Sequence, residues 1–398
     1  MKKFIIIPLL FLITSCGKKY DPYKMPADVK INLNKNDFLV FENHISNELI
    51  KDSNVEIVSK NKLISDKIGK HIYTLKYRYN NKIYKYDITY NIIDKTKPVF
   101  LNSVSSINIL VNNDDILCNR ISFADNYDPN PTCSIEGDYD FTKTGKYDLE
   151  FVIKDSSNNE DRRKFTLNIV DEIEKNNNKP TPNYLYIDDI IKKYKNDNTS
   201  IGVDISKWQG NIDFNKIKKA GIEFVIMRIG YQKNPNDEFE IDPKFKEYYE
   251  QAKKANLKVS VYLYNVSLTE KDAVKSANYI IKMLNGDKLD LPIGYDFENW
   301  SNFNDYNTSL YTLSKSYLAF ESILKKHGYD SMLYSSKYYL ENAWMNYDNS
   351  NVWLAHYTDK TDYQGKYMLW QMTSLCKLDG ITENTVDIDI LYKNNYIK

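Results

Sequence analysis

Beyond Ser200, short apolar runs alternate along the chain with amphipathic segments of helical periodicity. The apolar runs at residues 203–205, 224–227 and 259–264 predict buried strands, and the segments at residues 214–220 and 243–255 predict helices between them. The same pattern predicts further strands at residues 292–298, 332–334, 352–355 and 367–371, and further helices at residues 272–284 and 311–327. Strands that alternate with helices are typical of an α/β fold.

The part of the chain before Ser200 has the two-residue alternation of half-buried strands, and it contains an internal repeat. Residues 147–153 alternate apolar and polar side chains, and a polar turn at residues 155–159 separates them from a second alternating run at residues 165–169. Residues 69–94 repeat the pattern of residues 145–171, about 76 residues earlier. The pattern therefore predicts two small β domains.

The second copy resembles the last hairpin of bacterial Ig-like modules, which has the form G-x-Y-x-[LV]-x-[FY]-x-[AV]-x-D-x-x-x-N. The resemblance is carried by Gly145, Tyr147, Leu149, Phe151, Asp155 and Asn159. It implies all-β Ig-like sandwiches at residues 26–95 and 96–172, with the weaker match in the first copy because its turn, Asn80-Asn81, is shorter. Such modules are usually spacers. A polar Asn/Lys-rich linker at residues 173–199, with one helical turn near residues 184–194, is expected to follow.

The N-terminus has the layout of an export signal. Lys2 and Lys3 precede an apolar run at residues 4–13, and the sequence Ile13-Thr14-Ser15-Cys16 follows. A run of about 10 residues is too short to span about 30 Å of hydrocarbon. The segment resembles a bacterial lipoprotein signal, which implies removal of residues 1–15, lipid on Cys16 and an extracytoplasmic, membrane-anchored protein. An ordinary cleaved signal with a chance cysteine is the alternative.

The remaining cysteines and histidines bear on stability and on cofactors. A disulfide between Cys118 and Cys133 would close a loop of about 15 residues and contribute about 3 kcal/mol in an oxidising compartment. Two buried thiols on neighbouring strands are the alternative. The 4 histidines are scattered and no glycine-rich phosphate loop occurs, so we expect neither metal nor cofactor. The acidic group Asp125, Asp128 and Asn130 is interpreted as a solvated loop rather than a calcium site.

The charge balance and the aromatic content bear on possible partners. Lys+Arg 54 against Asp+Glu 54 gives a net charge of 0, which argues against a basic groove for nucleic acid. The chain has 34 Tyr, and aromatic rings of this kind suit both β-sheet faces and carbohydrate stacking. Composition does not choose between these two uses.

Asp296 and Glu298 are the most distinctive pair of polar residues in the α/β region. Residues two apart on a strand face the same side, so both carboxylates are predicted at the carboxyl end of one strand. Two neighbouring carboxylates suit acid catalysis on a glycoside, because one holds a proton while the other stays ionised. A solvated strand end and a calcium ligand pair are the alternatives.

Five motifs in this region resemble those of the glycoside hydrolase family 25 lysozymes, which are N-acetylmuramidases. They are Gly202-Val203-Asp204-Ile205-Ser206-Lys207-Trp208-Gln209-Gly210-Asn211-Ile212-Asp213-Phe214, Tyr295-Asp296-Phe297-Glu298, Trp353-Leu354-Ala355-His356-Tyr357, Leu369-Trp370-Gln371, and Gly380-Ile381 with Val386-Asp387-Ile388-Asp389. The resemblance implies a TIM-like barrel at residues 200–398. It also implies hydrolysis of the β-1,4 bond between N-acetylmuramic acid and N-acetylglucosamine in peptidoglycan.

The same resemblance implies roles for four carboxyl groups. Glu298 corresponds to the general acid, and Asp296 to the carboxylate that orients the acetamido group of the substrate for attack on the anomeric carbon. Asp204 and Asp387 correspond to flanking acids that position water or stabilise positive charge on the sugar. A helix cap at Asp204, a turn residue at Asp387, and an inverting route through an activated water are the alternatives.

Aromatic residues near these motifs are candidates for the sugar subsites, with core packing as the alternative. They are Tyr262, Tyr264, Trp353, Tyr357 and Trp370. The chain departs from the family in two places: Tyr262-Leu263-Tyr264 stands where Y-H-F is frequent, and Asp387-Ile388-Asp389 stands where D-x-N is frequent.

The sequence thus predicts a monomeric, lipid-anchored muramidase with two Ig-like spacers, which acts on the glycan strands of peptidoglycan and binds no nucleic acid. A wall-binding or adhesive surface protein whose barrel has lost turnover is one alternative. Another is that the Ig-like pair binds a partner and is the main functional element.

Overall fold

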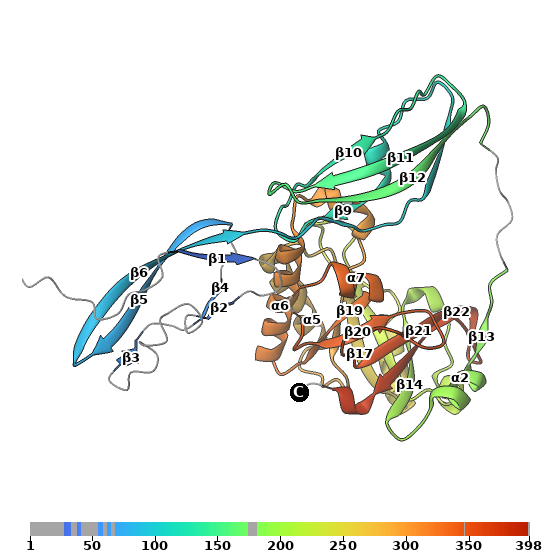
Figure 1. The fold of residues 1–398 in the computed structure, drawn as a ribbon. Helices are drawn as coiled ribbons and strands as arrows, with labels where there is room; N and C mark the ends of the chain where they lie inside the picture. The colour runs from blue at the N-terminus through green and yellow to red at the C-terminus, as the bar shows by residue number, and fades with distance from the viewer. Residues whose placement is uncertain are drawn as a thin grey trace, which may run out of the picture. The chain divides into compact units, whose positions relative to one another are not determined.

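A computed structural model describes residues 28–32, 38–40, 55–58, 62–64, 68–173, 181–345 and 347–396. The chain divides into two compact units, Met1–Lys95 and Thr96–Lys398, whose elements are labelled in Figure 1. The predicted signal segment with Cys16 lies outside the described residues. Among the helices of the described part, none is both long and apolar enough to cross a bilayer.

The first unit is built from short strands and one long hairpin. A sheet has the strand order β1-β6-β5-β3, and β2 pairs with β4 separately. The strands are β1 (Asp28–Asn32), β2 (Phe38–Val40), β3 (Val55–Ile57), β4 (Lys62–Ile64), β5 (Gly69–Tyr79) and β6 (Lys82–Ile93). Asn80 and Asn81 join β5 to β6 with φ of 47° and 59°, the left-handed conformation that a two-residue hairpin turn requires.

The second β-module, residues 99–170, repeats this topology inside the second unit. Its sheet has the order β10-β11-β12-β8, and β8 runs parallel to β12 as β1 runs parallel to β6. The strands are β7 (Val99–Phe100), β8 (Ser106–Leu110), β9 (Phe123–Ala124), β10 (Thr132–Glu136), β11 (Gly145–Lys154) and β12 (Glu160–Val170). A disulfide joins Cys118 to Cys133, with Cα atoms 5.9 Å apart.

The strands beyond residue 198 close into a barrel. The order β21-β20-β19-β18-β17-β15-β14-β22 is closed by pairing of β22 with β21, and β22 is antiparallel to both of its neighbours. The strands are β14 (Thr199–Ile205), β15 (Phe224–Tyr231), β17 (Lys258–Tyr264), β18 (Ile293–Asp296), β19 (Ser331–Ser336), β20 (Asn351–Ala355), β21 (Leu369–Leu378) and β22 (Ile381–Tyr392). β16 (Glu240–Ile241) pairs with β15 outside this ring.

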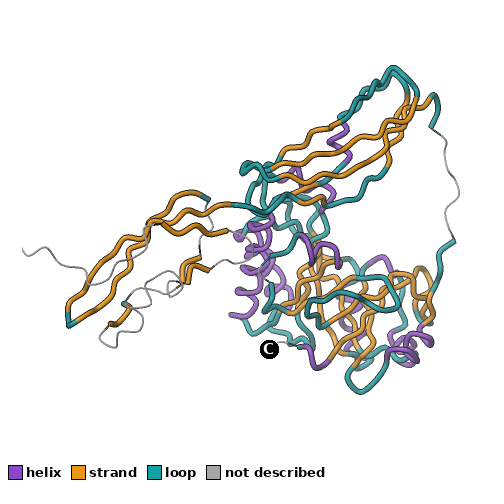
Figure 2. Tube along the Cα trace, in the orientation of Figure 1, coloured by secondary structure: helices purple, strands orange, loops and turns teal. Residues whose placement is uncertain are grey.

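A helix follows each of five barrel strands; the first four are predicted by the sequence, and the last is not. They are α3 (Phe214–Lys219), α4 (Phe245–Lys254), α5 (Glu270–Leu284), α6 (Leu310–Lys326) and α7 (Lys337–Asn342). Figure 2 shows the helices outside the barrel strands. Asp213 begins α3 by accepting hydrogen bonds from the amides of Asn215 (3.1 Å) and Lys216 (3.0 Å). A side-chain cap of this kind fixes the residue at which the helix begins.

Two segments outside the barrel strands also contribute to its packing. Helix α2 (Ile187–Tyr194) buries Ile187 and Ile190 in the barrel core, and β13 (Leu185–Tyr186) pairs with β21, so the end of the expected linker belongs to the barrel. In the second β-module, Leu101 and Ala124 join the same core. The module is therefore packed on the barrel through its β7 and β9 segments.

Candidate active site

Carboxyl groups from three barrel strands meet at one end of the barrel. Asp204 is the next-to-last residue of β14, and Asp296 is the last residue of β18. Because β22 runs antiparallel, its first half lies beside the carboxyl ends of the other strands, and Asp387 pairs directly with Asp204. Asp204 and Asp296 thus lie at the carboxyl ends of their strands. We call Asp204, Asp296, Glu298, Asp387 and Asp389 the carboxyl cluster.

Asp204 is held by a glutamine that also orients two tyrosines. Gln371 donates from Nε2 to Asp204 Oδ2 at 2.8 Å. Its Oε1 accepts hydrogen bonds from the hydroxyls of Tyr334 (2.9 Å) and Tyr357 (3.0 Å). The amide is thereby fixed, with its NH2 group toward the carboxyl group. Burial, together with the charge of Asp389, raises the pKa of Asp204 well above its ordinary value.

Asp296 and Glu298 lie side by side in different environments. Asp296 is 3% exposed, and its Oδ1 has no hydrogen-bond donor among the described residues. Burial and the charge of Glu298 raise its pKa well above the ordinary value. Glu298 is exposed and lies beyond the end of β18, so the prediction that both residues belong to one strand is wrong. Phe297, between the two carboxyl groups, is buried in the core and packs against Trp300.

Asp387 and Asp389 add two more carboxyl groups from β22. Burial and the charge of Asp204 raise the pKa of Asp387 to about 8. Burial raises the pKa of Asp389 to about 8, although a hydrogen bond from Trp353 Nε1 to its Oδ1 at 2.6 Å opposes the shift. Burial thus raises the pKa of all four aspartates of the cluster and favours their protonated forms.

A cavity of about 650 Å³ opens beside Glu298. Its lining includes the rings of Tyr334, Tyr338, Tyr339 and Tyr357, which are joined by charged groups on and near α7. A cavity lined by aromatic residues and by a carboxyl group suits a sugar ligand.

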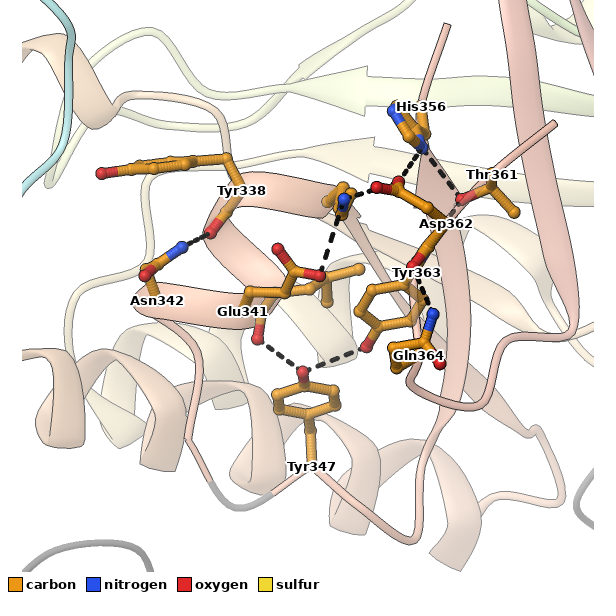
Figure 3. A network of polar contacts seen from close by, with 11 residues as sticks. Tyr338, Glu341, Asn342, Tyr347, His356, Thr361, Asp362, Tyr363 and Gln364 are labelled. Carbon is orange, nitrogen blue, oxygen red and sulfur yellow. Dashed lines mark hydrogen bonds and ion pairs between the residues drawn. The ribbon is translucent and has the colours of Figure 1, made fainter. Parts of the chain in front are cut away.

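A polar network adjoins the part of the cavity that is lined by Lys337, Glu341 and His356, and Figure 3 shows it from close by. Asp362 accepts from Lys337 Nζ at 2.5 Å and lies 3.8 Å from His356 Nδ1. His356 Nδ1 also shares a hydrogen bond with Thr361 Oγ1 at 2.9 Å. These bonds fix the loop after β20 against the start of α7.

The aromatic residues that the sequence suggests for sugar binding divide by exposure. Tyr357 is 57% exposed and lines the cavity, and Tyr262 and Tyr264 are half-buried. Trp353 and Trp370 are 1% and 2% exposed, so their ring faces are closed to a ligand. Their indole N–H groups donate to Asp389 and to the carbonyl of His356.

Three further residues at this end of the barrel are missing from the sequence-based prediction. Gln371 and Tyr334 hold Asp204 and Tyr357 in place, as described above. Trp208 is 63% exposed, although its ring is large and apolar, and it follows Asp204 by one short turn. Gln371 and Trp208 had a signal in the sequence, because each lies within one of the five motifs, whereas Tyr334 had none.

Comparison with known proteins adds to this geometry. Residues 203–381 match the family model of glycosyl hydrolases family 25. These residues are a family 25 glycoside hydrolase domain. The family 25 domain contains Asp204, Asp296, Glu298 and Gln371, and the matched range ends before Asp387 and Asp389.

One curated relative of the family 25 domain is the autolytic lysozyme of Clostridium acetobutylicum, 27% identical over 190 residues. The match covers 47% of this chain and 54% of that protein, so this chain spans about half the length of the relative. Similar solved structures include the spore cortex lytic enzyme SleM of Clostridium perfringens (20% identity, 50% of this chain and 68% of the other, TM-score 0.44). Another is a family 25 glycosyl hydrolase of Bacillus anthracis (21% identity, 50% and 92% covered, TM-score 0.42).

Proposed function

We propose that this chain is a cell-wall muramidase that hydrolyses the β-1,4 bond between N-acetylmuramic acid and N-acetylglucosamine in peptidoglycan. The observation that carries this proposal is the carboxyl cluster beside an aromatic cavity, within a family 25 domain. Glycoside hydrolysis needs a proton donor next to the glycosidic oxygen and negative charge close to the anomeric carbon. The cluster offers both within one site.

In this proposal Glu298 is the general acid. Its carboxyl group lines the cavity and is open to solvent, so a glycosidic oxygen can reach it. The neighbouring Asp296 is buried, and its Oδ1 lacks a donor among the described residues. A substrate acetamido N–H would supply such a donor. This supports a role for Asp296 in orienting the acetamido group for attack on the anomeric carbon.

Asp204 and Asp387 would lie near the anomeric carbon, opposite each other on β14 and β22. Each would stabilise the positive charge that develops on the sugar ring, or would position the water that completes hydrolysis. Both the acetamido-assisted route and an inverting route use these carboxyl groups. The configuration of the first-formed reducing end, measured by NMR during the reaction, separates the two routes.

The location of the enzyme is a further part of the proposal. Cys16 would carry lipid, and the two β domains would act as Ig-like spacers between the membrane and the family 25 domain. Extraction of the expressed chain with detergent, and loss of membrane association in a Cys16→Ser variant, would support the anchor. Equal membrane association of the two would contradict it.

The test of the proposed activity is digestion of purified peptidoglycan by the chain that follows the signal segment and by its Glu298→Gln variant. Mass spectrometry then identifies the new reducing-end sugar. Reducing-end N-acetylmuramic acid from the parent, with little from the variant, is expected. Retained wall binding without release of sugar by either protein would instead support a non-catalytic recognition protein.

A further inference from the structure

Asp389 is a wholly buried carboxyl group, two residues after Asp387 on β22. Its Oδ1 accepts the indole N–H of Trp353 at 2.6 Å. Its Oδ2 is buried and has no hydrogen-bond donor among the described residues. A buried carboxylate oxygen without a donor is costly, so the side chain requires a proton or a partner that carries one.

The partner that faces Asp389 is Asp204. Asp389 pairs across the sheet with Gly202, two residues before Asp204, so the two side chains are diagonal neighbours on one face of the paired strands. A hydrogen bond between the two carboxyl groups contributes to the raised pKa of Asp204. On the other side of β22, Asp389 pairs with Gln371, whose amide holds Asp204 Oδ2 at 2.8 Å. Each carboxyl group thus has one donor from the protein, and the two face each other.

The surrounding charges do not supply a cation to this pair. The titratable and charged groups that face it from the other strands and their loops are Asp387 on β22, Asp296 and Glu298 at the end of β18, Tyr262 on β17, Tyr334 on β19, Arg228 on β15 and Tyr357 after β20. Arg228 is engaged by Asp242, with Nε 2.8 Å from Oδ2. Two ionised carboxylates side by side in such a site would repel each other strongly.

We propose that Asp204 and Asp389 share one proton, and that Asp389 is a positioning residue that keeps Asp204 protonated into the neutral pH range. The proton on Asp204 is donated to Asp389, while Gln371 and Trp353 hold the remaining oxygens. Burial raises the pKa of both groups; the charge of Asp389 raises the pKa of Asp204 further, whereas the hydrogen bond from Asp204 lowers the pKa of Asp389, as expected when the proton lies on Asp204. The two groups then titrate as a pair.

The pair of carboxyl groups exists because this chain has Asp389 where the D-x-N pattern has asparagine. An asparagine at position 389 could accept the Trp353 N–H through its oxygen and donate its NH2 group to Asp204. An amide donor stabilises ionised Asp204, whereas a carboxyl partner stabilises the protonated form. The consequence for catalysis rests on the proposed function: the cleft carries one negative charge fewer near neutral pH, and the pH range of activity moves upward. The sharing of the proton itself does not depend on that function.

The experiment follows the 13Cγ resonances of aspartate in the chain after the signal segment, labelled at aspartate and titrated from acid to alkaline pH. Asp204 is assigned by the signal lost in Asp204→Asn. In the parent, Asp204 is expected to titrate far above its ordinary range and in a step linked to Asp389. In Asp389→Asn, the midpoint of Asp204 is expected to fall by about one pH unit or more.

The matched control is Asp379→Asn, which removes an exposed carboxyl group from the turn between β21 and β22 and should leave the Asp204 midpoint unchanged. An equal Asp204 midpoint in the parent and in Asp389→Asn would overturn the proposal. So would titration of Asp204 near pH 4 in the parent, a result that requires no variant to fold.

The pH profile of kcat/KM on peptidoglycan gives the second readout. One limb should move toward acid in Asp389→Asn by the same amount as the resonance, whereas a merely structural role would lower the amplitude without moving the limb. If no hydrolysis is found for any protein, the proposed function fails, while the titration still decides whether the proton is shared.

Discussion

Two aspartates of the second β-module, Asp128 and Asp155, receive hydrogen bonds from nearby amides on their carboxyl oxygens. Asp155 is buried and accepts from the backbone amide and the side-chain amide of Asn159, both at 2.7 Å. Asp128 accepts from the amides of Asn130 (2.8 Å) and Ser156 (2.7 Å) and so ties two loops together. At the barrel end, by contrast, Asp296 Oδ1 and Asp389 Oδ2 are buried and have no donor among the described residues.

The difference separates aspartates whose hydrogen bonds support the fold from buried carboxyl groups to which our proposal gives a role in catalysis. Amide donors stabilise an ionised carboxylate, and the hydrogen bonds in turn stabilise the loops that provide them. Where donors are scarce and other acids are close, burial favours the protonated form, and the fold gains nothing from the charge. A carboxyl group that is protonated near neutral pH can donate its proton in acid catalysis, although its burial lowers the stability of the fold.

The largest expected effect that tests this contrast is a loss of hydrolytic activity. Glu298→Gln removes the proposed proton donor and is expected to lower kcat/KM on peptidoglycan by about a thousandfold. Unfolding of the barrel should change by no more than about 0.5 kcal/mol, because Glu298 is exposed. All 5 tryptophans lie beyond residue 200, so tryptophan fluorescence during urea unfolding reports on the barrel alone.

The matched control for this variant is Glu250→Gln, an exposed glutamate on α4. It should retain parental activity and stability. Loss of activity in both variants, or in neither, would remove Glu298 from its proposed role.

The second largest effect should fall on the β-module. Cys118→Ser opens the disulfide to Cys133 and is expected to destabilise the module by about 3 kcal/mol. Calorimetry should show a lower midpoint for a transition that tryptophan fluorescence does not follow. Treatment of the parent with a reducing agent should reproduce the shift, and a single unchanged transition would show that the disulfide contributes little to the module.

A smaller loss is expected when the tie between the two module loops is removed. Asp128→Ala leaves the amides of Asn130 and Ser156 without their acceptor and should destabilise the module by about 1–2 kcal/mol. Activity per folded molecule should be unchanged. Asp138→Ala, at an exposed position of the same module, is the control and should have no measurable effect on either quantity.

The smallest effect concerns the pH dependence of barrel stability. The pKa of Asp387 is about 8 in the folded chain and about 3.9 in an unfolded one, so the fold binds more protons between these values. The free energy of unfolding should therefore fall as pH rises from about 4 to 8. Asp387→Asn should make that fall smaller in fluorescence-monitored urea unfolding. An identical pH slope in the variant would contradict the raised pKa.

The sequence alone predicts most of the barrel elements, because buried parallel strands are short apolar runs between amphipathic helices. The strand that contains Asp387 was not predicted, since its pairing with β14 and β21 depends on closure of the whole barrel. Closure also decides which aromatic rings are accessible. Trp353 and Tyr357 belong to one motif, yet only Tyr357 reaches the cavity.

The sequence predicts which carboxyl residues form the candidate site, but it predicts less well how each is buried and which residues it contacts. The Asp296–Glu298 spacing indicates two carboxyl groups on one face of a strand, but β18 ends at Asp296, and Glu298 lies exposed beyond the strand end. The bonds that Gln371 makes to Asp204, Tyr334 and Tyr357 join residues of separate strands and their loops. Long-range pairing of this kind leaves no local pattern in the sequence.

The most direct test of the contrast is the behaviour of Asp296→Asn, with barrel unfolding and peptidoglycan hydrolysis measured on the same preparation. The substitution replaces a buried carboxyl group beside Glu298 with a neutral amide. The expected result is a barrel more stable by about 1 kcal/mol whose turnover is about a hundredfold slower. A barrel that is less stable and turns over at the parental rate would show that Asp296 supports the fold, and would contradict the assignment of the carboxyl cluster to catalysis.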